Sequence, residues 1–283
     1  DEQLKAKIYS IKEISPNVID LVIKSPMATK NYQPGQIFRL QNFAFSLDKT
    51  IKPLALSPYE VDQEQGLIYF VILKTGISTK LCSNFKHGEE VAIMGPTGSK
   101  SIIPESQTVI LVGEGVRNMA LLPIAQKLKQ QGKKILFFAI YKKLEDVFYA
   151  NKIKELAYKT HILILSRKDN NNKEIINDLI SKIKTTQSPK GSYIICYVKS
   201  EMLIKIKEYG QELFEDYPFI SNILAPMQCM MKGICGQCIQ KTDDHKGYIF
   251  SCACLEYDIK KFDPRVTAIR LEQNSLLENS LKY

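Results

Sequence analysis

The sequence predicts an α+β multidomain protein with three parts: an antiparallel β-barrel, a central α/β domain with a parallel sheet, and a small cysteine-rich module. Short apolar runs separated by turn residues fill the first hundred positions, as in small barrels. Apolar runs then alternate with helical patterns, which is typical of βαβ units. Five of the seven cysteines follow within residues 229–254. We place the parts at residues 1–103, 104–218 and 219–283.

Length and composition agree with this division. A chain of 283 residues is long enough for two domains and a small module. Hydrophobic residues make up 45% and charged residues 24%, as in ordinary globular proteins. We see no apolar run long enough for a membrane span and no export signal, so we expect a cytoplasmic protein. The first residue is Asp, which is consistent with a processed chain or a piece of a longer one.

The formal net charge is +9, and lysines are spread along the whole chain. Because no basic block interleaves with aromatic residues, we do not expect nucleic-acid binding. A solvated lysine-rich surface explains the charge, and electrostatic steering toward an acidic partner or an anionic dinucleotide is a second interpretation.

The barrel is predicted from six apolar runs punctuated by turns such as Pro34-Gly35. The expected strands are residues 8–11, 18–23, 37–40, 54–56, 67–73 and 91–94.

Three local patterns lie inside this barrel. They are Pro-Gly-Gln-Ile-Phe-Arg-Leu at residues 34–40, Lys-Pro-Leu-Ala-Leu-Ser at 52–57, and Gly-Ile-Ser-Thr at 76–79, which Gly-Pro-Thr-Gly follows at 95–98. Each pattern alone is most simply a turn or a helix cap. A helix start with a nearby hydroxyl is also a natural anion site.

The central domain is predicted from apolar runs without alternation, which indicate parallel strands buried on both faces. The expected strands are residues 109–112, 135–140, 161–165 and 193–198, and the expected helices are about 118–130, 147–157, 175–183 and 202–214. The first strand and helix are joined by Gly113-Glu-Gly-Val-Arg-Asn118, a glycine pair that is weak evidence for nucleotide binding by itself. Lys142 and Lys143 follow the second strand, where they would favour a 2′-phosphate or simply form a solvated turn.

The cysteines have the spacing C-x5-C-x2-C-x13-C, from Cys229 to Cys252, with Cys254 two residues further on. A tight trio and a distant fourth thiolate are typical of [2Fe–2S] proteins, although the plant-type spacing begins C-x4-C. Gly233 and Gly236 would permit the sharp turns that such a loop needs. Structural zinc is the main alternative, and a disulfide framework is a weaker one.

In their order and distances, the three barrel patterns resemble the flavin-binding barrel of the ferredoxin–NADP reductase superfamily. The closest likeness is to its iron–sulfur branch, which includes the electron-transfer subunit of dihydroorotate dehydrogenase and carries its cysteines at the C-terminus. In that family an Arg contacts the flavin phosphate side and a hydroxyl lies near flavin N5; here Lys52 and Ala55 stand at these positions, and Ser57 could supply the hydroxyl. The resemblance implies FAD bound by Lys52, Pro53, Leu54, Ala55, Ser57, Gly76, Ser78 and Thr79.

The resemblance also implies a site for NAD(H) or NADP(H) as substrate. The family's glycine loop is Gly-Gly-Gly-x-Gly-x, whereas this chain has Glu114, a negative charge, and Arg117 in place of a glycine; Arg117 could instead bind phosphate itself. The family's Cys-Gly-Pro turn near the nicotinamide becomes Cys196-Tyr197-Val198. The implied dinucleotide residues are Gly113, Gly115, Arg117, Asn118 and Cys196.

We therefore expect an electron-transfer flavoprotein, an oxidoreductase that moves electrons between NAD(P)H, FAD and a [2Fe–2S] cluster. Its partner would be another redox subunit or a fused domain, in a hetero-oligomer or a longer chain. Two alternatives remain open: an electron-transfer or structural subunit with a non-functional dinucleotide site, and a zinc-binding interaction module. The expected cluster ligands are Cys229, Cys235, Cys238 and Cys252, with Cys254 as an alternative fourth.

Overall fold

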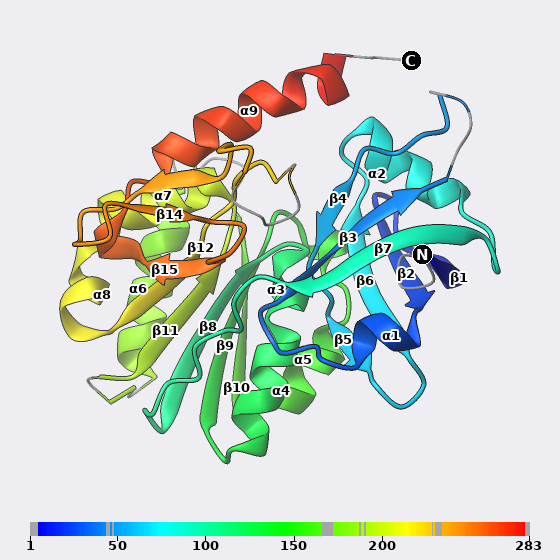
Figure 1. The fold of residues 1–283 in the computed structure, drawn as a ribbon. Helices are drawn as coiled ribbons and strands as arrows, with labels where there is room; N and C mark the ends of the chain where they lie inside the picture. The colour runs from blue at the N-terminus through cyan, green and yellow to red at the C-terminus, as the bar shows by residue number, and fades with distance from the viewer. Residues whose placement is uncertain are drawn as a thin grey trace.

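Two large β-sheets, each with its own helices, lie side by side in the computed structural model (Figure 1), and a two-stranded sheet accompanies them. The structure describes residues 5–43, 46, 48–165, 172–186, 188–189, 191–227, 229 and 234–280, with side chains described to residue 273. Within these residues, we find no helix with the length and apolar character needed to cross a membrane.

The first sheet has seven strands in the order β4-β3-β7-β1-β2-β6-β5, and all its neighbouring strands pair antiparallel. Alternate residues face one core, which includes Ile19, Leu21 and Phe70. The six predicted strands are confirmed. The seventh strand, β5, was not predicted, because it carries a single apolar residue, Val61. The elements are β1 (Lys5–Ser15), β2 (Val18–Lys24), α1 (Pro26–Thr29), β3 (Ile37–Asn42), β4 (Leu54–Leu56), β5 (Glu60–Asp62), β6 (Leu67–Leu73), α2 (Ile77–Leu81), η2 (Cys82–Asn84) and β7 (Glu90–Thr97).

The second sheet has six strands in the order β10-β9-β8-β11-β12-β15, and all are parallel except β15. Every residue of β8 is buried, as expected for a central strand covered on both faces. The elements are β8 (Thr108–Glu114), α3 (Arg117–Ala120), α4 (Leu122–Gln130), β9 (Lys134–Tyr141), η3 (Leu144–Asp146), α5 (Ala150–Leu156), β10 (Lys159–Ile164), α6 (Lys173–Thr185), β11 (Tyr193–Tyr197), α7 (Ser200–Tyr209), α8 (Gln211–Asp216), β12 (Phe219–Asn222) and β15 (Glu256–Asp258).

The two sheets share part of their core. One face of the second sheet packs against α6 and α7. The other face packs against α4 and α5, and this core also contains Val18 and Tyr59 of the first sheet. The predicted α+β fold class is thereby confirmed, with an antiparallel sheet followed by a sheet that is mostly parallel.

Some elements differ from expectation. The helix expected at residues 202–214 is divided into α7 and α8 at Gly210, a residue with low helix propensity. The strands β12 and β15 were not predicted, and they extend the second sheet beyond residue 218. The boundaries after residues 103 and 218 stay predictions.

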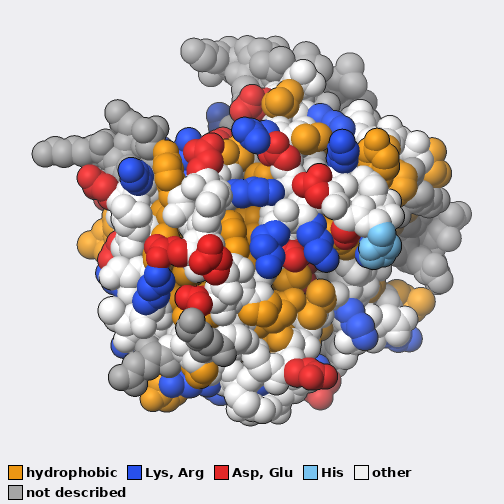
Figure 2. Space-filling view, turned by 90° about the vertical axis from the view of Figure 1, so that its left-hand side faces the viewer, with side chains coloured by type: hydrophobic (Ala, Val, Ile, Leu, Met, Phe, Trp, Pro, Cys, Tyr) orange, Lys and Arg blue, Asp and Glu red, His pale blue; other side chains and the backbone are white. Residues whose placement is uncertain are grey.

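The C-terminal part forms a hairpin and a long helix. The elements are β13 (Ile239–Lys241), β14 (Tyr248–Phe250), η4 (Ile259–Lys261) and α9 (Arg265–Ser280). The helix α9 was not predicted; it contacts α7, β13 and α2, and it runs along the top of the molecule from one sheet region to the other (Figure 1). On the face shown in Figure 2, basic and acidic side chains lie interspersed.

Candidate flavin cavity and cysteine site

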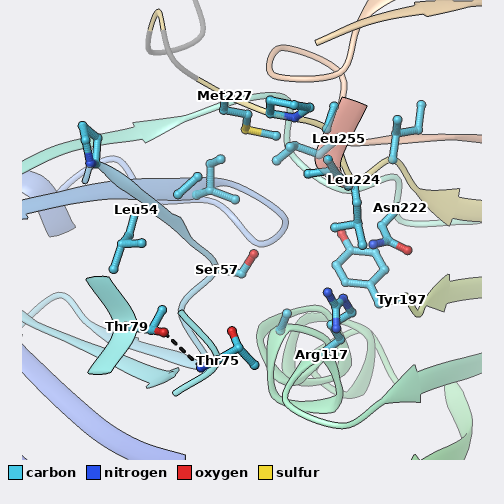
Figure 3. Close-up of a pocket in the computed structure, with 18 of the residues that line it drawn as sticks. Leu54, Ser57, Thr75, Thr79, Arg117, Tyr197, Asn222, Leu224, Met227 and Leu255 are labelled. Carbon is cyan, nitrogen blue, oxygen red and sulfur yellow. Dashed lines mark hydrogen bonds between the residues drawn. The ribbon is translucent and has the colours of Figure 1, made fainter. Parts of the chain in front are cut away.

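A cavity of about 480 Å³ lies where the first sheet, the second sheet and the C-terminal segment meet (Figure 3). All eight residues predicted to bind FAD line it: Lys52, Pro53, Leu54, Ala55, Ser57, Gly76, Ser78 and Thr79. Their contacts with a flavin stay predictions, but the structure brings them together from two separate segments.

Hydroxyl groups hold these two segments in place. The buried Ser78 Oγ accepts a hydrogen bond from the backbone N–H of Lys52 at 2.9 Å. Thr79 Oγ1 accepts from the backbone N–H groups of Gly76 at 3.0 Å and Thr75 at 3.1 Å. Ser78 and Thr79 therefore fix the shape of the cavity wall through hydrogen bonds within the chain.

The strand β4 contributes the side wall. Ala55 and Ser57 are both exposed, two residues apart, as expected for one face of a strand. Figure 3 shows the Ser57 hydroxyl directed into the cavity, with Arg117 and Tyr197 on the opposite wall. This position is consistent with the prediction that Ser57 supplies the hydroxyl that Ala55 lacks.

The glycine loop between β8 and α3 is closely packed. A Cβ atom on Gly113 would lie 2.2 Å from Asn118 Oδ1 and 2.9 Å from Asn118 Cα, so only glycine allows α3 to approach β8 this closely. The fully buried Asn118 donates from Nδ2 to the Gly115 carbonyl at 3.0 Å and to the Ile140 carbonyl at 3.4 Å. Of the loop residues, Arg117 lines the cavity; the dinucleotide roles of Gly113, Gly115, Arg117 and Asn118 stay predictions.

Glu114 is the last residue of β8, and its side chain is buried. Its Oε2 accepts a hydrogen bond from the backbone N–H of Lys199 at 2.8 Å, and its Oε1 lies 3.9 Å from Lys199 Nζ. Burial lowers the pKa of Arg117, and the carboxylates of Glu114 and Glu201 oppose that shift. Glu114 thus has partners of its own within the chain.

Successive residues of β11 face opposite sides of the sheet. Cys196 is fully buried in the core beneath α6 and α7. Tyr197 faces the other way and lines the cavity. Cys196 is therefore placed away from the cavity wall, and its predicted contact with a nicotinamide stays a prediction. Sequence reasoning missed Tyr197 as a cavity residue, although strand alternation could have identified it.

A buried carboxylate, Glu256, connects three parts of the chain. Its Oε1 accepts from the Tyr197 hydroxyl at 2.6 Å and from Ser101 Oγ at 2.7 Å, and its Oε2 accepts from the Ile102 N–H at 3.3 Å. Burial raises the pKa of Glu256, and these hydrogen bonds oppose the shift in part. Burial and the neighbouring carboxylate also raise the pKa of Tyr197. The pair links the cavity wall to β15.

The cysteine site is partly assembled. The sulfurs of Cys238 and Cys252 lie 3.1 Å apart, and both residues are buried. Cys229 Sγ accepts from the Ile234 N–H at 3.3 Å, and Cys235 is exposed. The Cys254 thiol instead donates to the Glu256 carbonyl at 3.3 Å. Gly233 lies outside the described residues.

Among the residues that the structure describes, no three His, Cys, Asp or Glu side chains gather into a metal site. The pair Cys238 and Cys252 fits two ligands of a metal centre, since their two soft sulfur atoms lie side by side. The chain segment that includes Cys229 and Cys235 is described only in part, and the full ligand set stays a prediction.

The cavity and the cysteine pair share a wall. Ala225 and Met227 line the cavity. Ala225 forms a small buried cluster with Cys238 and Cys252, and Met227 packs against this cluster. The thiols are thus separated from the cavity by a single layer of side chains. Neither residue was anticipated from sequence, because their position depends on how the segment after β12 folds back.

Comparisons with known proteins agree with this architecture. No family profile matches the chain. The structure resembles that of an NADH-dependent reduced ferredoxin–NADP oxidoreductase, studied for flavin-based electron bifurcation, with a TM-score of 0.80, 23% identity, and coverage of 97% of this chain and 96% of that one. Phthalate dioxygenase reductase, described as a modular structure for electron transfer from pyridine nucleotides to [2Fe–2S], gives a TM-score of 0.61 at 14% identity, with 90% and 95% coverage.

Relatives by sequence include the electron transfer subunit of dihydroorotate dehydrogenase B (NAD(+)) of Bacillus cereus strain Q1, which is 29% identical over 155 residues, 53% of this chain and 58% of that protein. An uncharacterized protein of Rickettsia prowazekii is 36% identical over 278 residues, which are 98% of this chain and 33% of that protein. The chain thus spans from a third to somewhat over half of the length of these relatives. The fold is that of the ferredoxin–NADP reductase-like flavoprotein reductases, and the resemblance seen in the sequence is confirmed.

Proposed function

We propose that this chain is an electron-transfer flavoprotein that binds FAD in the cavity and a [2Fe–2S] cluster at Cys229, Cys235, Cys238 and Cys252, and that it exchanges electrons with a redox partner. A flavin exchanges electrons singly or in pairs and an iron–sulfur cluster exchanges them one at a time, so the two together convert one kind of transfer into the other. The observation that carries the proposal is the shared wall of Ala225 and Met227.

The cavity supports the FAD part of the proposal. Its volume of about 480 Å³ is within the usual range of small-molecule sites. Lys52 offers a cation at one wall, and Ser57 offers a hydroxyl at another. Leu54, Leu224 and Leu255 supply apolar surface for an aromatic ring system.

The visible spectrum of protein purified without air tests the proposal, together with iron, acid-labile sulfide and zinc analysis. We expect both flavin and cluster absorption, with iron and sulfide in equal amounts. Zinc without iron or sulfide would instead support the zinc-binding interaction module. Protein that takes up neither flavin nor iron would refute the electron-transfer function.

Two electron sources fit such a carrier. Names of the relatives include NAD(+) and NADH, which supports a nicotinamide dinucleotide, as the sequence predicts. The burial of Glu114 at the end of β8 and the position of Tyr197 favour the alternative, a subunit whose dinucleotide site is non-functional and whose electrons come from another redox protein.

A further inference from the structure

The carboxyl edge of a doubly wound parallel sheet is the place where such folds bind nucleotides. In this chain that edge includes the end of β8 and the start of α7. The backbone N–H of Lys199, the residue before α7, points at the Glu114 carboxylate at 2.8 Å. The Lys199 N–H, which could donate a hydrogen bond to an anionic ligand at this edge, therefore already donates one to the Glu114 side chain.

The Glu114 carboxylate also competes with a dinucleotide for the nearby cations, Arg117 and Lys199. A pyrophosphate carries negative charge and would need to approach the loop 113–118, where the buried carboxylate of Glu114 lies. Lys199 Nζ is 3.9 Å from that carboxylate, so its positive charge is partly used within the chain. Charges that face each other in a partly buried site interact strongly because water screens them little.

Tyr197 limits access on the second side. Its ring fills part of the cavity wall opposite Ser57 (Figure 3). Its hydroxyl is fixed by Glu256 at 2.6 Å, and Glu256 is in turn held by Ser101 at 2.7 Å. Moving the ring aside would remove the shortest of the three hydrogen bonds that the buried Glu256 carboxylate accepts, which is costly. A planar nicotinamide ring therefore has no free approach from this wall.

We propose that Glu114 and Tyr197 set the reaction type of this chain: they exclude hydride transfer from a nicotinamide dinucleotide and leave electron exchange with a one-electron redox protein. This inference rests on the proposed FAD site. Two molecules of the reduced partner are oxidised, and each gives one electron. These two electrons and a proton from water replace the one hydride that a nicotinamide would give. The contacts of Glu114 and Tyr197 lie within this chain and are the same whichever partner supplies the electrons.

The first test titrates the anaerobic protein with NADH and with NADPH, each to about 1 mM, the upper end of usual KM values. We expect the flavin absorption to stay unchanged and dithionite to bleach it fully. Equilibrium dialysis of both nucleotides gives a second readout, with no binding expected. Rapid bleaching by either nucleotide would overturn the inference and leave the proposed carrier function intact. Protein without flavin would refute the carrier function, while dialysis would still decide the inference.

The second test restores small residues. In the double variant Glu114→Gly with Tyr197→Gly, we expect nucleotide binding to become measurable by dialysis, with a dissociation constant at least about tenfold below the detection limit that the wild type sets, which corresponds to about 1.4 kcal/mol. Glu201→Gln is the matched control, because it removes an exposed carboxylate near Arg117 and should leave binding undetectable. Tyr197→Phe keeps the ring and should also bind no nucleotide. If the double variant does not fold, the wild-type titration decides; if it folds and binds no better than Glu201→Gln, the assignment of these two residues is wrong.

Discussion

At the scale of single residues, Cys252 and Cys254 have different surroundings although they are two positions apart. Cys252 Sγ lies 3.1 Å from Cys238 Sγ, whereas the Cys254 thiol donates to a backbone carbonyl at 3.3 Å. Burial also raises the pKa of Cys254, which disfavours the thiolate that metals require. We expect Cys252→Ser to lose or shift the cluster absorption and Cys254→Ser to keep it. Iron content and the electron paramagnetic resonance spectrum of the reduced proteins measure this, and the opposite outcome would make Cys254 the ligand.

Glu256 gives the protein a specific pH dependence. Burial raises its pKa above the ordinary 4.5, so the folded state holds a proton that the unfolded chain releases. Between 4.5 and the raised value the folded state binds more protons, and the free energy of unfolding falls as the pH rises through that window. We expect Glu256→Gln to remove this fall, by about 1.4 kcal/mol for each unit of the shift.

Urea unfolding of both proteins across a pH series measures the effect. Glu13→Gln, at an exposed carboxylate that pairs with Lys74 at 3.0 Å, is a suitable control. If wild type and Glu256→Gln show parallel pH profiles, the burial of Glu256 has no energetic consequence for folding.

At the scale of elements, α9 holds the loop that carries Cys238. Arg270 Nη1 donates to the Ile239 carbonyl and, at 3.3 Å, to the Gln237 carbonyl. These two residues flank Cys238, so we expect Arg270→Met to loosen the cysteine loop and speed cluster loss in air about threefold or more, since a hydrogen bond from a charged donor contributes about 1.5–3 kcal/mol. The decay of cluster absorption measures the rate.

Arg265→Met is the control, because the Arg265 side chain forms an ion pair with its near neighbour Asp263 at 2.8 Å. Equal rates of cluster loss in the two variants would contradict this role for α9.

Local patterns in the sequence predicted the elements whose signals are local. The apolar runs that form β2, β6, β8 and β9 could be recognised in the sequence, because their apolar residues are the ones that the fold buries. The resemblance of residues 52–57 and 76–79 to a known family predicted which segments line one cavity. Contacts between distant residues could not be predicted in this way. The pairing of Asn222 with Glu256 and the place of Tyr197 on the cavity wall depend on how the chain returns to the sheet. The helix α9 was missed because its apolar residues do not gather on one face.

At the scale of the whole molecule, a cluster around Asp20 joins the two sheets. The Tyr59 hydroxyl donates to Asp20 Oδ2 at 2.9 Å, and the Tyr149 hydroxyl donates to the same oxygen. Lys152, in the first turn of α5, pairs with Glu60 at 3.1 Å and lies over the Tyr59 ring. Since Asp20 is in β2 and Tyr149 precedes α5, these contacts connect the antiparallel sheet to the helices of the other.

We expect Asp20→Ala to destabilise the protein by about 1–3 kcal/mol, because it leaves tyrosine hydroxyls at a buried contact without their acceptor. Urea unfolding followed by circular dichroism and by flavin release would show whether the two sheets then unfold separately. The control is Glu13→Ala, whose exposed ion pair should contribute less than about 1 kcal/mol. A variant Asp20→Ala as stable as this control would show that the junction does not stabilise the protein.

The position of β15 has a consequence for how this protein is made. The strand β12 ends at Asn222, and its antiparallel neighbour β15 begins only at Glu256, after all the predicted cluster ligands. On the ribosome, the edge of β12 therefore stays bare until the cysteine segment has been synthesised and has folded back. A bare strand edge is where chains pair wrongly with one another. The return of β15 to this edge thus protects the nascent chain from aggregation, and on the proposed function we expect a shortage of iron and sulfide to lower the yield of soluble protein.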